Sequence, residues 1–321
     1  MLESITQFIQ KELNAFDKLY IDTLRTSTKN IQNMLDFVLN KNGKRIRPIV
    51  LILSAKLCGN PITKTLEYAV ILELLHVATL IHDDVVDNTN FRRGSQSAMV
   101  KFGNKIAVLL GDYIISKAIK QVVKTKNYTV IKTIANLAQD LCKGELMQLT
   151  LSNRNISECN YFEIIKKKTA ILFSACSKIG ALSVDADKKK TQTLKLIGEN
   201  LGICFQIKDD LFDYSSTEKL GKPTKNDIKN GKITLPLIYA LQTAPKSKSK
   251  FMMSIIEKQD FSSENINKLI NFSKEQKGTE YAHEKMLEIK MNTIALLNNF
   301  PSSKAKTYMI KLIDYIIERK Q

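Results

Sequence analysis

Proline and glycine are scarce in this chain of 321 residues, which holds six prolines and twelve glycines. No proline lies between Pro61 and Pro223, and Leu, Ile, Lys and Ala are frequent in that stretch. Because proline interrupts helices and these four residue types are compatible with them, the stretch favours helical structure. No segment alternates between apolar and polar residues with the period of two that indicates a strand. We therefore expect an all-α fold.

Signals for disulfides, secretion and membrane insertion are also absent. The five cysteines are scattered, odd in number and form no paired motif, so they indicate reduced thiols rather than a zinc site. The N-terminal residues lack the apolar core of a signal peptide, and no apolar run is long enough to span a bilayer. We expect a cytoplasmic protein with no transmembrane segment. Since no linker, repeat or shift in composition divides the chain, we expect a single domain over residues 1–321.

The formal charge is +17, from 49 Lys and Arg against 32 Asp and Glu. Such an excess favours polyanionic partners, namely nucleic acid, an anionic membrane surface or phosphorylated substrates. The lysines are spread over many segments, and no basic segment carries the interleaved aromatic residues of a single-strand binder. We interpret most of this charge as solvated surface and expect no nucleic-acid partner.

A helix expected from about Thr63 to Asp87 is apolar nearly all round, which predicts a buried position. It ends in Asp83, Asp84 and Asp87 and is followed by Arg92, Arg93 and Gly94. Buried carboxylates need cations or a cavity, and aspartates near a helix C-terminus are unfavourable without cations. The simpler alternative is a helix end that faces water. His76 shares a stripe with Asp83, whereas we interpret His82 as a polar group bonded locally.

A second central helix is expected over residues 191–214, with Gln206, Asp209 and Asp213 on one stripe and Asp210 beside them. Gly198 and Gly202 leave room there for a neighbouring helix or a chain-like ligand. A continuous helix over residues 158–184 contains Lys168 and Thr169, and the lysine faces either a cavity or solvent. Gly111 and Asp112 are expected to interrupt a helix over residues 106–123, and Pro236 is expected to start a further helix.

Two basic segments fall in expected loops. Gly43 ends one helix and Pro48 suits the first turn of the next, so Lys44, Arg45 and Arg47 lie where free backbone N–H groups already favour an anion. The glycine-bearing segment of residues 221–232 includes Lys222 and Lys232 and suits a lid over a phosphate site.

Both central helices end in the pattern Asp-Asp-x-x-Asp, and we expect the two clusters to face each other. Six converging carboxylates would repel without cations, and Mg²⁺ commonly bridges carboxylates to substrate phosphates. About two or three Mg²⁺ ions on a diphosphate would turn it into a leaving group. Because the helix walls below are apolar, the rest of the substrate should be a hydrocarbon, which indicates prenyl transfer. The oxygen dipoles of Thr169 and Gln206 would steady the allylic cation.

With these motifs in this order, the chain resembles the trans-isoprenyl diphosphate synthase (polyprenyl synthetase) family from about residue 40 to the C-terminus. The resemblance implies the isoprenoid synthase fold, a helical bundle around one cavity, and a homodimer. Lys225 departs from the family, which commonly has a glycine there. The resemblance implies that Mg²⁺ is bound by Asp83, Asp87 and Asp209, with support from Asp84, Asp210 and Asp213. It implies that isopentenyl diphosphate is bound by Lys44, Arg47, His76 and Arg93, and the allylic diphosphate by Arg92, Lys168, Lys222 and Lys232. It also implies that the allylic cation is lined by Thr169 and Gln206.

Product length depends on the residues four and five positions before the first cluster, where the family's short-product enzymes carry bulky aromatics. Here these residues are Thr79 and Ala78, which are small, so we expect the helix to form one wall of an open product tunnel. We therefore expect a long, octaprenyl-like product that serves as a precursor of a quinone side chain, with association of the enzyme with the membrane through that product left open.

Four alternatives stay open at this point. A short-chain farnesyl or geranylgeranyl diphosphate synthase would differ in product length only. An HD-type metal phosphohydrolase would use His76, His82 and Asp83 but would not need the second cluster. A class I terpene cyclase would not need an acceptor-diphosphate site at Lys44, Arg47 and Arg93. A basic nucleic-acid-binding protein would leave the buried carboxylates unexplained.

Overall fold

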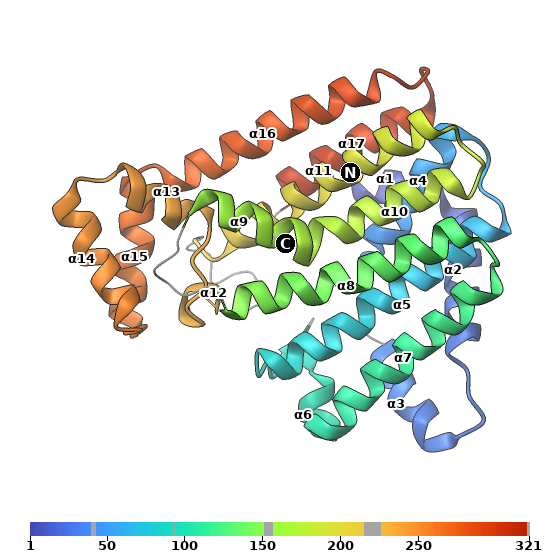
Figure 1. Ribbon diagram of the computed structural model, residues 1–321, viewed down its shortest axis with the longest axis horizontal. Coiled ribbons are helices and arrows are strands. Elements are labelled where there is room, and N and C mark those ends of the chain that lie inside the picture. Colours follow the sequence, from blue (N-terminus) through green and yellow to red (C-terminus); the bar gives the residue numbers. More distant parts are fainter. Residues whose placement is uncertain (40–42, 93, 151–156, 215–225, 320–321) are drawn as a thin grey trace. The chain divides into compact units, whose positions relative to one another are not determined.

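The computed structural model describes residues 1–39, 43–92, 94–150, 157–214 and 226–319. These ranges are helical apart from one pair of two-residue strands, which confirms the expected all-α class. The elements, of which Figure 1 labels the α-helices, are α1 (Leu2–Phe8), α2 (Gln10–Leu24), α3 (Lys29–Leu39), α4 (Ile46–Cys58), α5 (Thr63–Val86), β1 (Phe91–Arg92), β2 (Ser95–Gln96), α6 (Ala98–Phe102), α7 (Asn104–Lys124), α8 (Tyr128–Thr150), α9 (Glu158–Ile165), the π-helical turn η2 (Lys166–Ala170), α10 (Ile171–Leu182), α11 (Lys188–Phe212), α12 (Asn226–Lys229), α13 (Leu235–Thr243), α14 (Lys246–Glu257), α15 (Ser263–Glu275), α16 (Gly278–Leu297) and α17 (Lys304–Glu318).

Two compact units make up the chain. The first contains Met1–Ala138, Leu172–Gly198 and Asn299–Leu312, and the second contains Gln139–Ile171, Glu199–Asn298 and Ile313–Gln321. The first aspartate cluster belongs to the first unit and the second cluster to the second. The single domain expected over residues 1–321 stays a prediction.

Helix α5 forms the centre of the first unit, as its all-round apolar character predicts. It packs against α2, α4, α6 and α7, and its middle from Tyr68 to His76 is buried. The predicted end near Asp87 is confirmed, since the last helical residue is Val86 and Asp87 caps the helix. The central helix therefore carries its carboxylates out of the core at its C-terminal end.

The expected interruption of the helix over residues 106–123 is wrong, because α7 runs unbroken through Gly111 and Asp112. A Cβ atom at Gly111 would lie 2.2 Å from Nε2 of His82 on α5, so the glycine allows two helices to approach closely. The ring of His82 lies 3.1 Å from the Val108 carbonyl oxygen and 3.4 Å from the Asp112 carboxylate. These contacts confirm that His82 is bonded locally.

The second unit is built around α13, which packs against α9, α14, α15 and α16. Pro236 lies in the first turn of α13, as expected from its sequence position. Tyr281 of α16 stacks on Tyr239 of α13 and donates its hydroxyl hydrogen to the carboxylate of Glu158 at the start of α9. These contacts hold α9 in place, and α9 leads directly into the turn that contains Lys168 and Thr169.

The one long helix expected over residues 158–184 is confirmed over residues 158–182, and it contains a π-helical turn at Lys166–Ala170 between α9 and α10. Such a turn contains one residue more than an α-helical turn and therefore redirects its side chains, and π-helical insertions occur often at functional sites. Lys168 and Thr169 both lie within this turn.

A small hairpin and a short helix follow α5 where only a polar segment was expected. Phe91 and Arg92 pair antiparallel with Gln96 and Ser95, and Ser97 then caps α6. No helix in the described ranges is long and apolar enough to cross a membrane.

Candidate active site

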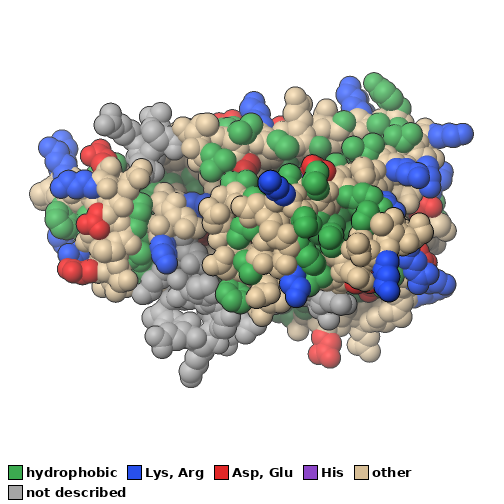
Figure 2. Space-filling model, turned by 90° about the horizontal axis from the view of Figure 1, so that it is seen from below, with side chains coloured by type: hydrophobic (Ala, Val, Ile, Leu, Met, Phe, Trp, Pro, Cys, Tyr) green, Lys and Arg blue, Asp and Glu red, His purple; other side chains and the backbone are tan. Residues whose placement is uncertain are grey.

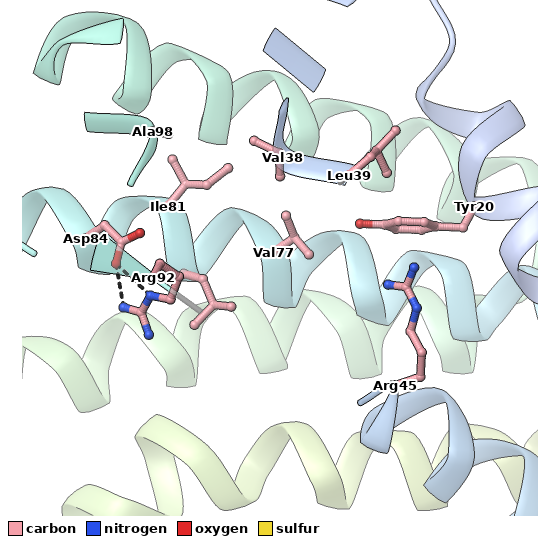
Figure 3. A pocket seen from close by; sticks show the side chains of 10 residues that line it. Tyr20, Val38, Leu39, Arg45, Val77, Ile81, Asp84, Arg92 and Ala98 are labelled. Carbon is pink, nitrogen blue, oxygen red and sulfur yellow. Dashed lines mark hydrogen bonds and ion pairs between the residues drawn. The ribbon is translucent and has the colours of Figure 1, made fainter. Parts of the chain in front are cut away.

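The first aspartate cluster lies at the end of α5, and its members differ in environment. Asp84 is 3% exposed, whereas Asp83 and Asp87 are half-buried. One oxygen of Asp84 accepts hydrogen bonds from Nε and Nη2 of Arg92 at 2.8 and 2.5 Å, as Figure 3 shows. The hairpin therefore turns Arg92 back onto the buried carboxylate. Binding of an allylic diphosphate by Arg92 stays a prediction. In that case the guanidinium of Arg92 would contact both Asp84 and the diphosphate.

Three of the residues expected to bind the acceptor diphosphate lie in the first unit. Lys44 is exposed just before α4, and the guanidinium of Arg47 in the first turn of α4 lies 5.2 Å from the ring centroid of Phe173. His76 is buried on α5, against which α4 packs. The structure thus places these residues on two adjacent helices. The fourth, Arg93, lies outside the described residues.

In the second cluster, Asp209 is paired with a cation that the sequence did not indicate. Arg319 donates from Nη2 to Asp209 at 2.8 Å and to the Phe205 carbonyl oxygen at 3.0 Å. Its guanidinium also lies 4.0 Å from the ring centroid of Phe205 and 5.5 Å from that of Phe212. No sequence motif could have identified Arg319, because it follows an ordinary amphipathic helix near the end of the chain.

Asp210 is the centre of a buried hydrogen-bond network. It accepts from the hydroxyl of Tyr161 at 2.6 Å and from Nε2 of Gln206 at 2.8 Å. Thr169 in turn donates to Oε1 of Gln206 at 2.6 Å. The predicted cation-lining residues Thr169 and Gln206 therefore meet, and they are linked to a predicted metal ligand. Tyr161 was missed, since nothing in the sequence connects α9 with α11.

Burial in this network raises the pKa of Asp210 to about 8, and repulsion from Asp227 adds to the shift, while the hydrogen bonds from Tyr161 and Gln206 lower it. Burial raises the pKa of Tyr161 well above its usual range, and the negative charge of Asp210 adds to that shift. A carboxylate in this position ionises more easily when positive charge is present.

Asp213, the last member of the second cluster, binds the start of α12. Its carboxylate accepts a hydrogen bond of 2.6 Å from the backbone N–H of Asp227. The segment after α12 then leads to Lys232, which is half-buried. Asp213 therefore holds a basic segment next to the second cluster. Lys222 and Lys225 of the expected lid lie outside the described residues.

Lys168 faces inward from the π-helical turn and is paired with Glu145 of α8 at 2.5 Å, with 22% of its side chain exposed. A Cβ atom at Gly144 would lie 2.7 Å from the backbone nitrogen of Lys168, so α8 approaches the turn closely. These contacts show a largely buried, ion-paired lysine rather than a solvated one. Its contact with an allylic diphosphate stays a prediction.

The donor set fits a hard divalent cation such as Mg²⁺, because both clusters consist of carboxylates and Mg²⁺ prefers oxygen ligands. One carboxylate of each cluster is also paired with an arginine, Asp84 with Arg92 and Asp209 with Arg319. Among the described residues, no three His, Cys, Asp or Glu side chains gather in metal-binding geometry. The convergence of the two clusters on shared ions stays a prediction.

The two positions expected to control product length differ in the structure. Ala78 is fully buried, whereas Thr79 is half-buried and donates its hydroxyl hydrogen to the His76 carbonyl oxygen at 2.8 Å. A larger side chain would overpack the core at Ala78, whereas the partial exposure of Thr79 makes a larger side chain there less disruptive. Thr79 is therefore the better probe of the expected tunnel.

Comparison with known proteins agrees with these features. The model of the polyprenyl synthetase family matches residues 28–272. The chain is 29% identical over 320 residues to the octaprenyl diphosphate synthase of Haemophilus influenzae, covering 99% of this chain and 97% of that protein. It is 33% identical over 277 residues to the short chain isoprenyl diphosphate synthase of Methanocaldococcus jannaschii, covering 85% and 82%. A polyprenyl synthase from Caulobacter crescentus, solved with calcium and isoprenyl diphosphate, superimposes with a TM-score of 0.93 at 28% identity and covers 100% of this chain and 98% of that one.

Proposed function

The chain belongs to the polyprenyl synthetase family, and from this premise we propose that it condenses isopentenyl diphosphate with an allylic prenyl diphosphate to a long-chain, all-trans polyprenyl diphosphate. The observation that carries the proposal is the network in which Thr169 and Gln206 are linked to Asp210. The network joins Thr169 and Gln206, which would face an allylic cation, to Asp210, which would support the metal bound to the leaving diphosphate.

The orientation of the Thr169 hydroxyl supports its role beside a cation. Because its hydrogen is donated to Oε1 of Gln206, the lone pairs of the Thr169 oxygen are left for a developing positive charge. Gln206 cannot rotate freely, since its amide nitrogen is held by Asp210. Oxygen dipoles fixed in this way stabilise a transition state without reorganising at the moment of reaction.

Polyprenyl synthetases generally use Mg²⁺, and we assign about two or three ions to Asp83, Asp87 and Asp209, with Asp84, Asp210 and Asp213 in support. When bound, Mg²⁺ neutralises the diphosphate and makes it a better leaving group. The chain's own cations bind the two substrates. In this assignment Lys44, Arg47, His76 and Arg93 bind isopentenyl diphosphate, and Arg92, Lys168, Lys222 and Lys232 bind the allylic diphosphate.

A long product is favoured over the short-chain alternative because Ala78 and Thr79 leave the tunnel open below the first cluster. The resemblance to an octaprenyl diphosphate synthase over nearly the whole chain supports the same choice. Such a product would serve in isoprenoid and quinone biosynthesis. Because the chain is also 33% identical to a short chain isoprenyl diphosphate synthase, the length of its product needs direct measurement.

An HD-type phosphohydrolase is less consistent with the site. Its mechanism would need His82 as a metal ligand, whereas the imidazole of His82 contacts the Val108 carbonyl oxygen and the Asp112 carboxylate of α7. It would also give no role to the network around Asp210.

We further propose a cytoplasmic homodimer that forms through the outer face of α7. Leu109, Ile119 and Val123 of this helix are 66%, 54% and 57% exposed, although its opposite face packs on α5. Figure 2 shows the molecule from the side on which α7 lies in Figure 1, and hydrophobic side chains gather there. Exposed apolar side chains along one side of a helix are typical of a protein interface. Binding to a membrane would then occur through the product.

The proposal is tested by incubating the protein with labelled isopentenyl diphosphate, Mg²⁺ and a panel of allylic primers, followed by chromatography of the dephosphorylated products. Elongation with a long product supports it. Release of phosphate from a primer without isopentenyl diphosphate would instead favour a phosphohydrolase.

A further inference from the structure

Arg45 is paired with two carboxylates of its own unit. Its Nε lies 3.2 Å from the Asp17 carboxylate of α2, and its Nη1 lies 3.4 Å from the Glu73 carboxylate of α5. The guanidinium also stacks over the rings of Tyr20 and Phe16, with centroid distances of 5.0 and 5.6 Å. With 23% of its side chain exposed, Arg45 is bound to two helices rather than directed to solvent.

The backbone of Arg45 is in the left-handed region, with φ 52° and ψ 31°, immediately before α4. A bulky side chain rarely adopts this conformation, so neighbouring contacts must hold it. The contacts with Asp17, Glu73 and Tyr20 are suited to that task. The turn also separates the side chains around it, since Lys44 is exposed, Arg45 faces inward and Arg47 is half-buried.

Glu73 connects this turn with a second part of the site. It is 4% exposed on α5 and lies three residues before His76, so the two side chains are neighbours on the helix surface. The pair Arg45–Glu73 therefore fixes the segment with Lys44 and Arg47 relative to the helix that carries His76.

The space beside Arg45 is small. A cavity of about 40 Å³ is lined by Arg45 and Tyr20 and also by Asp84 and Arg92, and Figure 3 shows these residues with apolar side chains between them. A single water needs about 10–15 Å³, so this cavity has room for a few waters.

We propose that Arg45 is a positioning residue for the acceptor substrate: held by Asp17 and Glu73, it maintains the left-handed turn that sets Lys44 and Arg47 against His76. The inference rests on the proposed function, in which these three residues bind isopentenyl diphosphate.

The test is the steady-state kinetics of Arg45→Gln. The KM for isopentenyl diphosphate should rise about tenfold, within the roughly hundredfold loss that a misplacement of about 1 Å can cause. The KM for the allylic substrate, the kcat at saturating isopentenyl diphosphate and the product length should stay unchanged. The KM of Arg45→Lys for isopentenyl diphosphate should lie between those of the wild-type protein and Arg45→Gln, because lysine keeps the charge but lacks the planar guanidinium group.

Lys56→Gln is the matched control. Lys56 also lies on α4 and also pairs with α2, at 2.5 Å from Glu12, but it is at the far end of the helix from the turn. Its removal should leave the KM for isopentenyl diphosphate unchanged. In addition, Glu73→Gln should raise this KM, and the double variant with Arg45→Gln should add little to the larger single effect.

An equal rise in both KM values, or a rise with Lys56→Gln as large as that with Arg45→Gln, would overturn the positioning role. If Arg45→Gln does not fold, Asp17→Asn decides the matter, because this carboxylate is 47% exposed and its loss should be tolerated. An unchanged KM for isopentenyl diphosphate in Asp17→Asn would then overturn the inference. Failure of the wild-type protein to elongate any primer would overturn the proposed function itself, which distinguishes the two results.

Discussion

Replacement of Tyr161 by phenylalanine tests whether the buried network around Asp210 serves the metal site. The substitution removes one hydroxyl group from a side chain that is 6% exposed and leaves the ring in place. Asp210 loses the 2.6 Å hydrogen bond from Tyr161 but keeps the bond from Gln206. The perturbation is therefore confined to the second carboxylate cluster.

The loss of stability caused by Tyr161→Phe depends on the charge of Asp210. With its pKa at about 8 in the cation-free protein, the carboxyl group is largely protonated at neutral pH, and its bond to Tyr161 contributes about 1 kcal/mol. When a bound cation ionises Asp210, the same bond becomes charge-assisted and contributes about 2 kcal/mol. The substitution should therefore reduce the stabilisation by Mg²⁺ and diphosphate by about 1 kcal/mol.

The assay combines thermal unfolding, with and without Mg²⁺ and diphosphate, and steady-state elongation. We expect Tyr161→Phe to weaken the apparent Mg²⁺ affinity and to lower kcat by about tenfold, as the loss of a group that orients a metal ligand commonly does. Thr293→Val is the matched control, since it also removes one buried hydroxyl group from the second unit, where Thr293 is 1% exposed and accepts a hydrogen bond from Nδ2 of Asn200 at 3.0 Å. If both variants lose the same stability and neither changes the Mg²⁺ dependence, the network has no role in the site.

Three further predictions concern product length, the pH dependence of stability and the dimer. Thr79→Tyr should shorten the product without loss of stability, and a product of unchanged length by chromatography would refute the tunnel wall. Burial raises the pKa of Asp210 to about 8, so in the absence of cations the folded protein keeps a proton that the unfolded chain releases above about pH 4. The free energy of unfolding of the cation-free protein should therefore fall between about pH 4 and 8, by at most about 1.4 kcal/mol per pH unit. Asp210→Asn should remove that slope in denaturant titrations at several pH values. Leu109→Glu should give a monomer in light scattering, and a dimer of unchanged stability would place the interface elsewhere.

Periodicity predicted the elements that carry the site, because long apolar helices have a strong sequence signal. The bounds of α5 were predicted within a residue or two, and the aspartates at the ends of α5 and α11 were recognised from their spacing and charge. Local chemistry also identified the start of α13 at Pro236. These features depend on residues close together in the chain.

The partners of the site residues were not predictable, because they come from distant segments. Tyr161 and Asp210 are 49 residues apart, and Arg319 and Asp209 are 110 residues apart. The pair Asp84–Arg92 needs the hairpin after α5, whose strands of two residues are too short for a periodic signal. Gly111 was misread because a glycine at a close helix contact has the same sequence signal as one that ends a helix.

The most direct measurement of the central claim is the elongation of a labelled isopentenyl diphosphate by the purified protein with Mg²⁺ and allylic primers, compared with Asp83→Ala and Asp209→Ala. We expect a long all-trans polyprenyl diphosphate from the wild-type protein and a large loss of kcat in each variant, since each removes a proposed metal ligand from one cluster. Absence of elongation with every primer, or full activity in both variants, would contradict the claim that the two clusters act together in prenyl transfer.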